Sequence, residues 1–353
     1  MLHPNISQLE IKSLTDLEFT PFDEVIDVRS PSEYEEDHIP GSINLPMLDN
    51  DQRALVGVEH KQKGPFSARR LGAQIISSNI ASILEAHLDS KDKAFKPLIY
   101  CWRGGKRSGS IAEVCRQIGW ETTVINGGYK SYRKLVVNNL YKEAFPFKII
   151  LLGGHTGTGK TEILESLPKL GVQVLNLEKL AEHRGSVFGK TTSSQPPQKY
   201  FESRIMEVLA TLNPSQTVVV EAESCKIGNV SLPPALWQKM KEADRINIQA
   251  PLEARVKYCL RSYRNLIPQG KGLTDLIDKL APFHAKKLVN EWKNLATGGA
   301  FEKLVTQLLH HHYDPRYGKK DCLETITLED LCQESFDSAT RYIADWINKS
   351  KNQ

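Results

Sequence analysis

The chain of 353 residues is long enough for two or three ordinary domains, and its 40% hydrophobic and 25% charged residues are typical of a folded globular protein. This composition excludes disordered and fibrous classes. The N-terminal stretch MLHPNISQLEIKSL lacks a basic start followed by an apolar core, and no later run reaches about 18 apolar residues. We therefore expect no secretion signal, no membrane partner and a cytoplasmic location. Six scattered cysteines without a C-x-x-C pair predict reduced thiols.

The net charge of +4 conceals an asymmetry along the chain. Residues 1–50 contain eleven acidic and two basic residues, whereas residues 239–293 contain twelve basic and six acidic residues. A basic stretch of this kind can attract a polyanion such as RNA, or it can be the solvated face of helices. The charge pattern alone leaves both interpretations open.

The first part of the chain predicts an α/β domain, which we place at residues 1–140. Three short apolar runs indicate buried strands: 24–28, 97–100 and 122–125. Residues 111–118 carry apolar side chains at helical spacing, and the last strand runs into the turn NGG at 126–128.

A second α/β unit is predicted at residues 146–235. Its apolar runs indicate strands at 148–153, near 172–177 and at 218–224, with a helix from residue 160. The remaining residues, 236–353, predict a mainly helical region packed with this unit and ending in an amphipathic stretch at 338–347.

The segment YCWRGGKRSGS at 100–110 places a cysteine in a glycine-rich, cationic loop between a strand and a helix. Its glycines allow successive N–H groups to point inward, and the following helix presents its positive end to the same place. Together with Arg103, Lys106 and Arg107, these effects should lower the pKa of Cys101 and make it a nucleophile. The alternative is an inert buried cysteine at a strand end, which needs no such density of cations.

Two families share this loop design. The pattern C-x-x-G-x-x-R-S resembles the phosphate loop of cysteine-dependent phosphatases, although Tyr100 stands where those enzymes carry a histidine. DVRSPSEYEEDHIPGSINLP at 27–46 and VINGGYKSY at 124–132 resemble the opening and closing signatures of rhodanese domains, which carry sulfur or selenium on the loop cysteine. The loop is one residue longer than the usual sulfurtransferase form, which suggests a larger anion.

GHTGTGKT at 154–161 fits the P-loop pattern G-x-x-x-x-G-K-[ST] and lies between a strand and a helix, as the motif requires. We expect its backbone, with Gly154, Gly157 and Gly159, to bind a diphosphate. Lys160 would neutralise the outer phosphate, and Thr161 could reach Mg²⁺.

Further residues around this loop are candidates for the same site. Glu221 and Glu223 end the strand VVVEAES, where an acidic residue can serve the metal or its water; either could instead cap a helix or pair with Lys226. Segments 182–189 and 195–204 are expected to be loops. They supply three candidate ligand contacts, Arg184, Gln198 and Lys199. No metal is assigned to the adjacent histidines 310–312, which cannot all face one ion.

Taken together, the motifs resemble the tRNA 2-selenouridine synthase family, a rhodanese domain fused to a P-loop domain. The motifs that carry the resemblance extend from residue 27 to 318: DVRSPSEY, YCWRGGKRS, GGHTGTGKTE, HRGSVFG with QPPQKYFE, EAESCKIG and HHYDPRYG. The resemblance implies an α/β rhodanese-like domain followed by a P-loop NTPase-like α/β domain with a helical C-terminal region. It also implies a transferase that acts on the wobble 2-thiouridine of tRNA.

The resemblance further implies two chemical steps. The thiocarbonyl sulfur is first alkylated by geranyl diphosphate held in the P-loop, and selenium from selenophosphate then replaces the geranylthio group. Cys101 would carry the selenium as S-selanylcysteine, with Arg103 and Arg107 in the same anion site. No tightly bound cofactor is implied, Mg²⁺ is possible, and a selenophosphate synthetase would supply the selenium donor.

On this reading the basic 239–293 region becomes a tRNA surface. Arg255, Arg261 and Arg264, spaced along one expected helix, are the candidate phosphate contacts. The competing predictions are a cysteine-dependent phosphatase or a plain sulfurtransferase with a nucleotide-binding domain, and an inactive rhodanese module used for binding.

Overall fold

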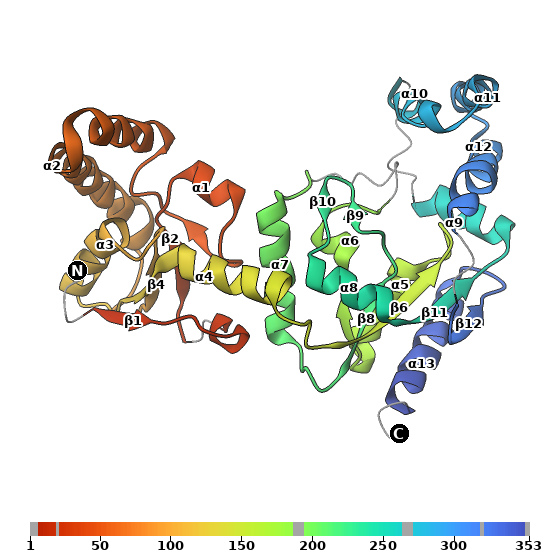
Figure 1. The fold of residues 1–353 in the computed structure, drawn as a ribbon, viewed down its shortest axis with the longest axis horizontal. Coiled ribbons are helices and arrows are strands. Elements are labelled where there is room, and N and C mark those ends of the chain that lie inside the picture. Colours follow the sequence, from red (N-terminus) through yellow and green to blue (C-terminus); the bar gives the residue numbers. More distant parts are fainter. Residues whose placement is uncertain (1–5, 19–20, 186–193, 263–270, 318–320, 350–353) are drawn as a thin grey trace. The chain divides into compact units, whose positions relative to one another are not determined.

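The chain folds as two compact units in a computed structural model that describes residues 6–18, 21–185, 194–262, 271–317 and 321–349 (Figure 1). Unit 1 comprises residues 1–144 and 196–211, and unit 2 comprises residues 145–195 and 212–353. The segment 196–211 therefore packs with unit 1, although it lies inside the stretch that the sequence analysis assigned to the P-loop domain. No helix in the described part of the chain is both long and apolar enough to cross a bilayer.

Unit 1 is built on a five-stranded sheet in which all neighbouring strands are parallel. The strand order is β1 (Ser7–Leu9), β5 (Thr123–Ile125), β4 (Pro97–Tyr100), β2 (Glu24–Asp27) and β3 (Ile43–Asn44). All four residues of β4 are buried, as expected for a strand inside a parallel sheet that is covered on both faces. The carboxyl ends of parallel strands share one edge, and Cys101 follows β4 at that edge.

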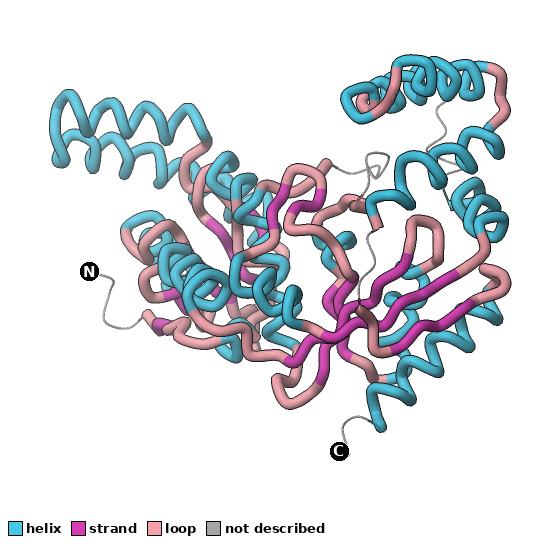
Figure 2. The backbone as a smooth tube through the Cα atoms, turned by 45° about the vertical axis from the view of Figure 1, so that its right-hand side comes forward, coloured by secondary structure: helices cyan, strands magenta, loops and turns pink. Residues whose placement is uncertain are grey.

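Helices connect and cover these strands. They are α1 (Pro31–Glu36), α2 (Asn50–Ile83), α3 (Lys106–Ile118), α4 (Gly128–Val137) and α7 (Gln198–Thr211). Within α2 the chain reverses at Gly64, whose φ is +87° and which precedes Pro65. Figure 2 shows the two halves of α2 lying side by side, and a Cβ placed on Gly72 would lie 3.8 Å from Val56.

Unit 2 contains a second five-stranded parallel sheet. Its order is β12 (Glu324–Thr327), β11 (Asp244–Gln249), β6 (Lys148–Gly154), β8 (Thr217–Glu221) and β7 (Gln173–Leu175). A small hairpin joins β9 (Lys226–Ile227) and β10 (Val230–Ser231). The region 236–353 is mostly helical, but it also supplies β11 and β12, which the sequence analysis did not identify.

The helices of unit 2 divide into a group that packs with the sheet and a group with its own core. They are α5 (Lys160–Ser166), α6 (Leu177–Leu180), α8 (Pro234–Glu242), α9 (Leu252–Ser262), α10 (Lys271–Asp278), α11 (Lys286–Thr297), α12 (Phe301–Leu308) and α13 (Gln333–Lys349). On α13, Phe336, Ile343 and Ile347 pack into the same core as Ile163 of α5. Helices α10–α12 close around fully buried Trp292.

Candidate functional site

Cys101 lies at the carboxyl end of β4 with its thiol inside a ring of hydrogen-bond donors. Its side chain is 4% exposed, and Sγ lies 3.2 Å from Ser108 Oγ and 3.3 Å from the Gly105 amide nitrogen. Burial raises the pKa of the thiol. Hydrogen bonds from the Ser108 hydroxyl and from the backbone amides of Ser108, Arg103 and Gly105 outweigh this effect, so the pKa is lowered. The Cys101 thiol therefore ionises at a lower pH than an ordinary cysteine thiol.

The closing turn of the rhodanese-like signature clamps this loop. Tyr129 N donates to Cys101 O at 2.9 Å, and Lys130 N donates to Trp102 O at 3.1 Å. Gly128 has a φ of +58°, and a Cβ there would lie 2.2 Å from Cys101 O. The resemblance of VINGGYKSY to the rhodanese closing motif thus has a physical cause, because only glycine allows this approach.

An open cavity of about 690 Å³ lies outside the thiol. Its wall is formed by Glu33, Glu36, Arg53, Cys101, Trp102, Arg103, Gly105, Lys106 and Arg107. Arg103 and Lys106 are exposed at the loop, which leaves their charges available to an anionic ligand.

Arg107 has a partner that the sequence analysis did not foresee. Its guanidinium bonds Glu33, with Nη1 at 2.6 Å from Oε2. Burial alone would raise the pKa of Glu33, but the ion pair with Arg107 prevails and lowers it to about 2. The groups that lower the pKa of Cys101 most are hydroxyl and amide donors, whereas Arg107 forms an ion pair with Glu33; the effect expected of its charge on the thiol stays a prediction.

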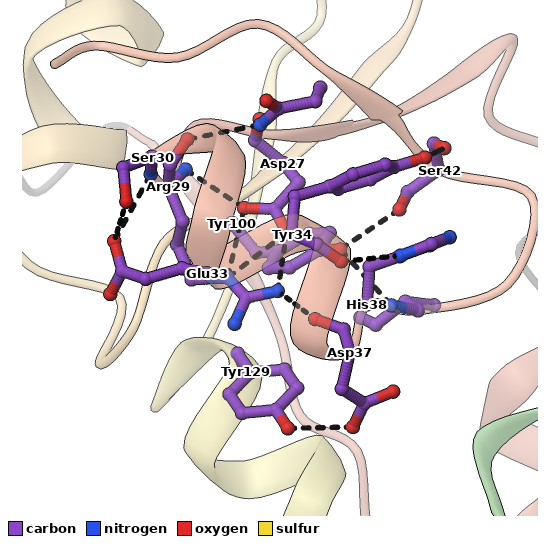
Figure 3. A network of polar contacts seen from close by, with 12 residues as sticks. Asp27, Arg29, Ser30, Glu33, Tyr34, Asp37, His38, Ser42, Tyr100 and Tyr129 are labelled. Carbon is purple, nitrogen blue, oxygen red and sulfur yellow. Dashed lines mark hydrogen bonds and ion pairs between the residues drawn. The ribbon is translucent and has the colours of Figure 1, made fainter. Parts of the chain in front are cut away.

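The DVRSPSEY segment takes part in a buried polar network (Figure 3). Arg29 is 1% exposed and forms an ion pair with Asp27, and its Nη2 donates to Asp37 O at 2.6 Å. Its guanidinium carbon lies 3.9 Å from the centre of the Tyr129 ring. Tyr129 in turn donates its hydroxyl to Asp37 Oδ2 at 2.6 Å. Through Arg29, Asp37 and Tyr129, the network joins the opening and closing signatures of the rhodanese-like domain.

Helix α7 docks on the same signature. His38 is stacked between Tyr34, at 3.7 Å between ring centres, and Tyr200 of α7, at 4.1 Å. Glu202 of α7 is 1% exposed and forms an ion pair with Arg133 of α4. The QPPQKYFE motif therefore contributes to unit 1.

Gln198 and Lys199 were expected to lie in a loop and to contact ligand; the structure corrects the loop assignment, and the ligand contact stays a prediction. The Gln198 amide donates to Glu202 Oε1 at 2.8 Å, and Lys199 Nζ bonds Glu36 Oε1 at 2.5 Å. Both residues lie in α7, which begins at Gln198, so most of the segment expected to be a loop is helical. Their partners belong to unit 1.

The P-loop follows β6 and leads into α5. Three of its glycines have positive φ values: Gly154 at +147°, Gly157 at +83° and Gly159 at +76°. A Cβ on Gly157 would lie 2.6 Å from Cys259 Sγ, and one on Gly159 would lie 2.2 Å from a carbon of the Phe336 ring. Helices α9 and α13 thus press directly on the loop, and glycine is required at these positions for space as well as for conformation.

Lys160 and Thr161 open α5, where the first amide groups of the helix lack intrahelical partners. Lys160 Nζ donates to Gly154 O at 2.7 Å and to His155 O at 3.1 Å. Thr161 is exposed on the first turn. The ammonium group thus lies at the loop itself, where a bound diphosphate would meet it.

Carboxylates gather beside the P-loop lysine. Glu221 is 4% exposed, and its Oε1 accepts from Glu178 N at 2.5 Å, while Oε2 is buried with no hydrogen-bond partner among the described residues. Burial raises the pKa of Glu221 to about 8. Burial and the carboxylates of Glu223 and Glu221 also hold the pKa of Glu178 well above its usual range, against the opposing charge of Lys160. Sequence reasoning named Glu221 and Glu223 but missed Glu178, which precedes them by more than forty residues.

A Mg²⁺ ion at this place would have few protein ligands. Within the described ranges, no group of three or more His, Cys, Asp or Glu side chains is arranged to hold a metal ion. Mg²⁺ commonly retains several waters and binds through one or two protein oxygens plus substrate phosphates. The unpartnered Oε2 of Glu221 fits such a sparse site.

Arg255 does not lie on an open surface, which corrects its assignment as a tRNA contact. It is 4% exposed, and its guanidinium makes two bonds to Asp314, at 3.0 and 2.6 Å. Its Nε donates to Thr156 O of the P-loop at 2.9 Å. Arg255 therefore holds the P-loop backbone at Thr156. Its partner Asp314, which lies in the HHYDPRYG motif, was missed by the sequence analysis.

The other candidate arginines are Arg184, Arg261 and Arg264, and the structure describes the first two. Arg261 is exposed, and one guanidinium nitrogen donates to Leu331 O at 3.0 Å. Arg184 is also exposed and donates to Ser262 O at 3.2 Å. Arg264 lies outside the described residues.

Comparisons with known proteins agree with this geometry. A family model described as the tRNA 2-selenouridine synthase AAA domain matches residues 147–270, and a rhodanese-like domain model matches residues 10–135. The tRNA 2-selenouridine synthase of Nitrosomonas eutropha is 35% identical over 77% of this chain and 70% of its own length. That of Nitrosomonas europaea is 34% identical over 70% and 65%, and that of Shewanella frigidimarina is 33% identical over 92% and 84%.

Proposed function

Because the chain belongs to the tRNA 2-selenouridine synthase family, we propose that it is a tRNA-modifying transferase that converts wobble 2-thiouridine to 2-selenouridine. The observation that carries the proposal is the presence in one chain of two different anion cradles. One holds a thiol of lowered pKa beside exposed cations, and the other is a P-loop with its lysine.

The first proposed step takes place at the P-loop, which binds geranyl diphosphate. The sulfur of 2-thiouridine attacks C1 of the geranyl group, the C1–O bond breaks, and its electron pair leaves with the diphosphate, while the N3 proton of the base passes to water. Amide groups of the loop, Lys160 and Thr161 would stabilise the charge on the departing diphosphate. If Mg²⁺ takes part, Thr161 with Glu221 or Glu223 would hold it, and the ion would supply further charge stabilisation.

The second proposed step belongs to Cys101. The Cys101 thiolate attacks C2 of the base, the C2–S bond breaks and geranylthiolate leaves. The selenium of selenophosphate, supplied by a selenophosphate synthetase, then displaces the Cys101 thiolate from C2, and water cleaves the Se–P bond and releases phosphate. An alkylated sulfur is a far better leaving group than a thiocarbonyl, which is why the geranyl step comes first. The open cavity and the exposed charge of Arg103 support selenophosphate binding at this loop.

The remaining proposal concerns the tRNA surface. The basic stretch 239–293 stays the proposed contact region, and Arg261 is the exposed one of its two candidate arginines that the structure describes. Changing Arg261 to alanine should weaken tRNA binding and flatten its salt dependence.

Nucleoside analysis of tRNA tests the function. We expect the protein with geranyl diphosphate alone to form S-geranyl-2-thiouridine, and with selenophosphate added to form 2-selenouridine. The Cys101→Ala variant should stop at the geranylated nucleoside, whereas Cys225→Ala, which alters an exposed cysteine, should behave like the unaltered protein. Absence of both nucleosides, or a selenonucleoside formed without geranyl diphosphate, would reject the proposal.

A further inference from the structure

His155 and Tyr317 form an aromatic pair beside the P-loop, and neither residue takes part in the two proposed steps. His155, the residue after Gly154, stacks on Tyr317 with 4.9 Å between ring centres and 21° between planes. Tyr317 comes from the HHYDPRYG motif, more than 150 residues later in the chain. The fold of unit 2 thus brings the Tyr317 ring into contact with two P-loop residues, His155 and Thr156.

Polar contacts hold both rings in place. Tyr317 and Thr156 share a hydrogen bond of 3.0 Å between their hydroxyl oxygens. His155 Nδ1 lies 3.2 Å from Asp314 Oδ1, and the same carboxylate binds Arg255, which bonds the loop carbonyl of Thr156. These contacts tie the pair to the backbone that would surround the diphosphate.

The pair also offers an uncharged, accessible surface. Tyr317 is 39% exposed, and the His155 side chain is 42% exposed. Burial lowers the pKa of His155, and the nearby charges of Asp314 and Arg255 act on it in opposite directions. The lowered pKa favours the neutral imidazole, and beside the P-loop and its Lys160 the two rings form an aromatic face.

We propose that His155 and Tyr317 bind the organic group of the diphosphate ester, with the first isoprene unit of the geranyl chain against the Tyr317 ring. The inference rests on the proposed function and deepens it by assigning the residues that select the ester. A P-loop alone recognises phosphates and carries no preference for an apolar chain. A stacked pair fixed to the loop at Thr156 supplies that preference at the point where the chain leaves the diphosphate.

The same rings suit the charge that develops during transfer. As the C1–O bond breaks and its electrons pass to the diphosphate oxygen, positive charge builds on the allylic C1 until the sulfur lone pair forms the C1–S bond. The face of an aromatic ring attracts positive charge through its quadrupole. The rings form no bond in this step, so Tyr317 is a specificity-determining residue for the diphosphate ester.

Calorimetric binding of geranyl diphosphate, inorganic pyrophosphate and ADP to the full-length protein tests the inference. Tyr317→Ala should weaken geranyl diphosphate binding by about tenfold while leaving inorganic pyrophosphate binding within about twofold. Tyr317→Phe keeps the ring and loses only the hydroxyl bond to Thr156, so geranyl diphosphate binding should stay within about threefold. The control is Tyr342→Ala, which removes an exposed tyrosine on α13 and should change neither affinity.

The possible failures are distinguishable. If the unaltered protein binds pyrophosphate but not geranyl diphosphate, the proposed function and this inference both fall. If it binds geranyl diphosphate and Tyr317→Ala weakens both ligands equally, Tyr317 merely supports the loop and only this inference is overturned. A selective loss of ADP binding, with geranyl diphosphate unaffected, would assign the rings to a nucleobase and also overturn it.

Discussion

The cysteine loop of unit 1 and the P-loop of unit 2 form anion cradles in the same way, with different side chains. Each follows a strand inside a parallel sheet, and each leads into the N-terminus of a helix. Each requires glycines at positive φ where other backbone or side chains press close, as at Gly128 and Gly159. The backbone arrangement therefore accounts for anion binding in both units, and the chemistry that distinguishes them must come from the side chains.

Carboxylates near the two cradles show the difference most clearly. Glu33, beside the cysteine loop, is bound to Arg107 and has its pKa lowered to about 2. Glu221, beside the P-loop, is buried with an unpartnered oxygen and has its pKa raised to about 8. The ion pair with Arg107 favours the charged form of Glu33, whereas burial favours the neutral form of Glu221.

The largest effect is expected from a single methyl group in the P-loop. Gly159→Ala would place a Cβ 2.2 Å from the Phe336 ring at a φ of +76°, so the loop must shift. We expect geranyl diphosphate to bind about 100-fold more weakly, as measured by calorimetry, because several amide donors lose their alignment together.

A matched substitution separates conformation from space. Gly171 has a similar φ of +73°, but nothing lies within 4 Å of a Cβ placed on it. Gly171→Ala should therefore cost about 1 kcal/mol of stability and leave binding within about twofold. Equal losses of binding in the two variants would show that packing against Phe336 does not shape the loop.

A smaller effect is expected from one hydroxyl group at the cysteine loop. Ser108→Ala removes the hydroxyl that lies 3.2 Å from Cys101 Sγ and so raises the pKa of the thiol. The rate of Cys101 alkylation at pH 7 should fall by about tenfold, since a hydrogen bond to a charged group is lost. Ser110→Ala is the control, because that hydroxyl donates to Lys106 O instead. An unchanged alkylation rate in Ser108→Ala would mean that the amide donors alone activate the thiol.

The smallest effects concern the pH dependence of stability, and they differ in sign between the two cradles. The folded pKa of Glu33 lies below its ordinary value of 4.5, so its stabilising contribution is present above pH 4.5 and is lost as the pH falls toward 2. The folded pKa of Glu221 lies above 4.5, so stability falls as the pH rises from 4.5 toward 8.

Thermal unfolding of two variants checks these signs. At pH 7, Glu33→Gln should lower the melting temperature by about 2 °C or more, and the difference should vanish near pH 2. Glu221→Gln should raise the melting temperature near pH 8 and change little below pH 4.5. Shifts of the same sign in both variants would contradict the contrast between the two acids.

Much of the fold followed from local patterns in the sequence. Strands β2, β4, β6 and β8 each contain a short run of consecutive apolar residues, and the two glycine-rich loops follow β4 and β6 as their motifs require. Strands β11 and β12 were missed because DRINIQ and ETIT contain only two and one apolar residues and lie in a region dominated by helices. Helix α7 was missed because the two prolines and polar residues that precede it are typical of a loop.

The site residues were harder to predict because their partners are distant in sequence. Arg255 has the charge and spacing of a surface cation, but Asp314 and Thr156, far away along the chain, draw it into the P-loop support. Arg107 likewise meets Glu33 only once α1 and α3 are folded. Glycine positions follow from backbone requirements and were predictable, whereas ion pairs between separate elements depend on the tertiary fold.

The P-loop and the cysteine loop are proposed to carry out different steps, and tRNA that is already geranylated tests this division most directly. The protein is given tRNA that already carries S-geranyl-2-thiouridine, together with selenophosphate, and 2-selenouridine is quantified. The account predicts that Lys160→Ala forms 2-selenouridine within about threefold of the unaltered rate, because the P-loop is no longer needed, whereas Cys101→Ala forms none. Selenation by Cys101→Ala, or a Lys160→Ala variant as inactive as Cys101→Ala, would contradict it.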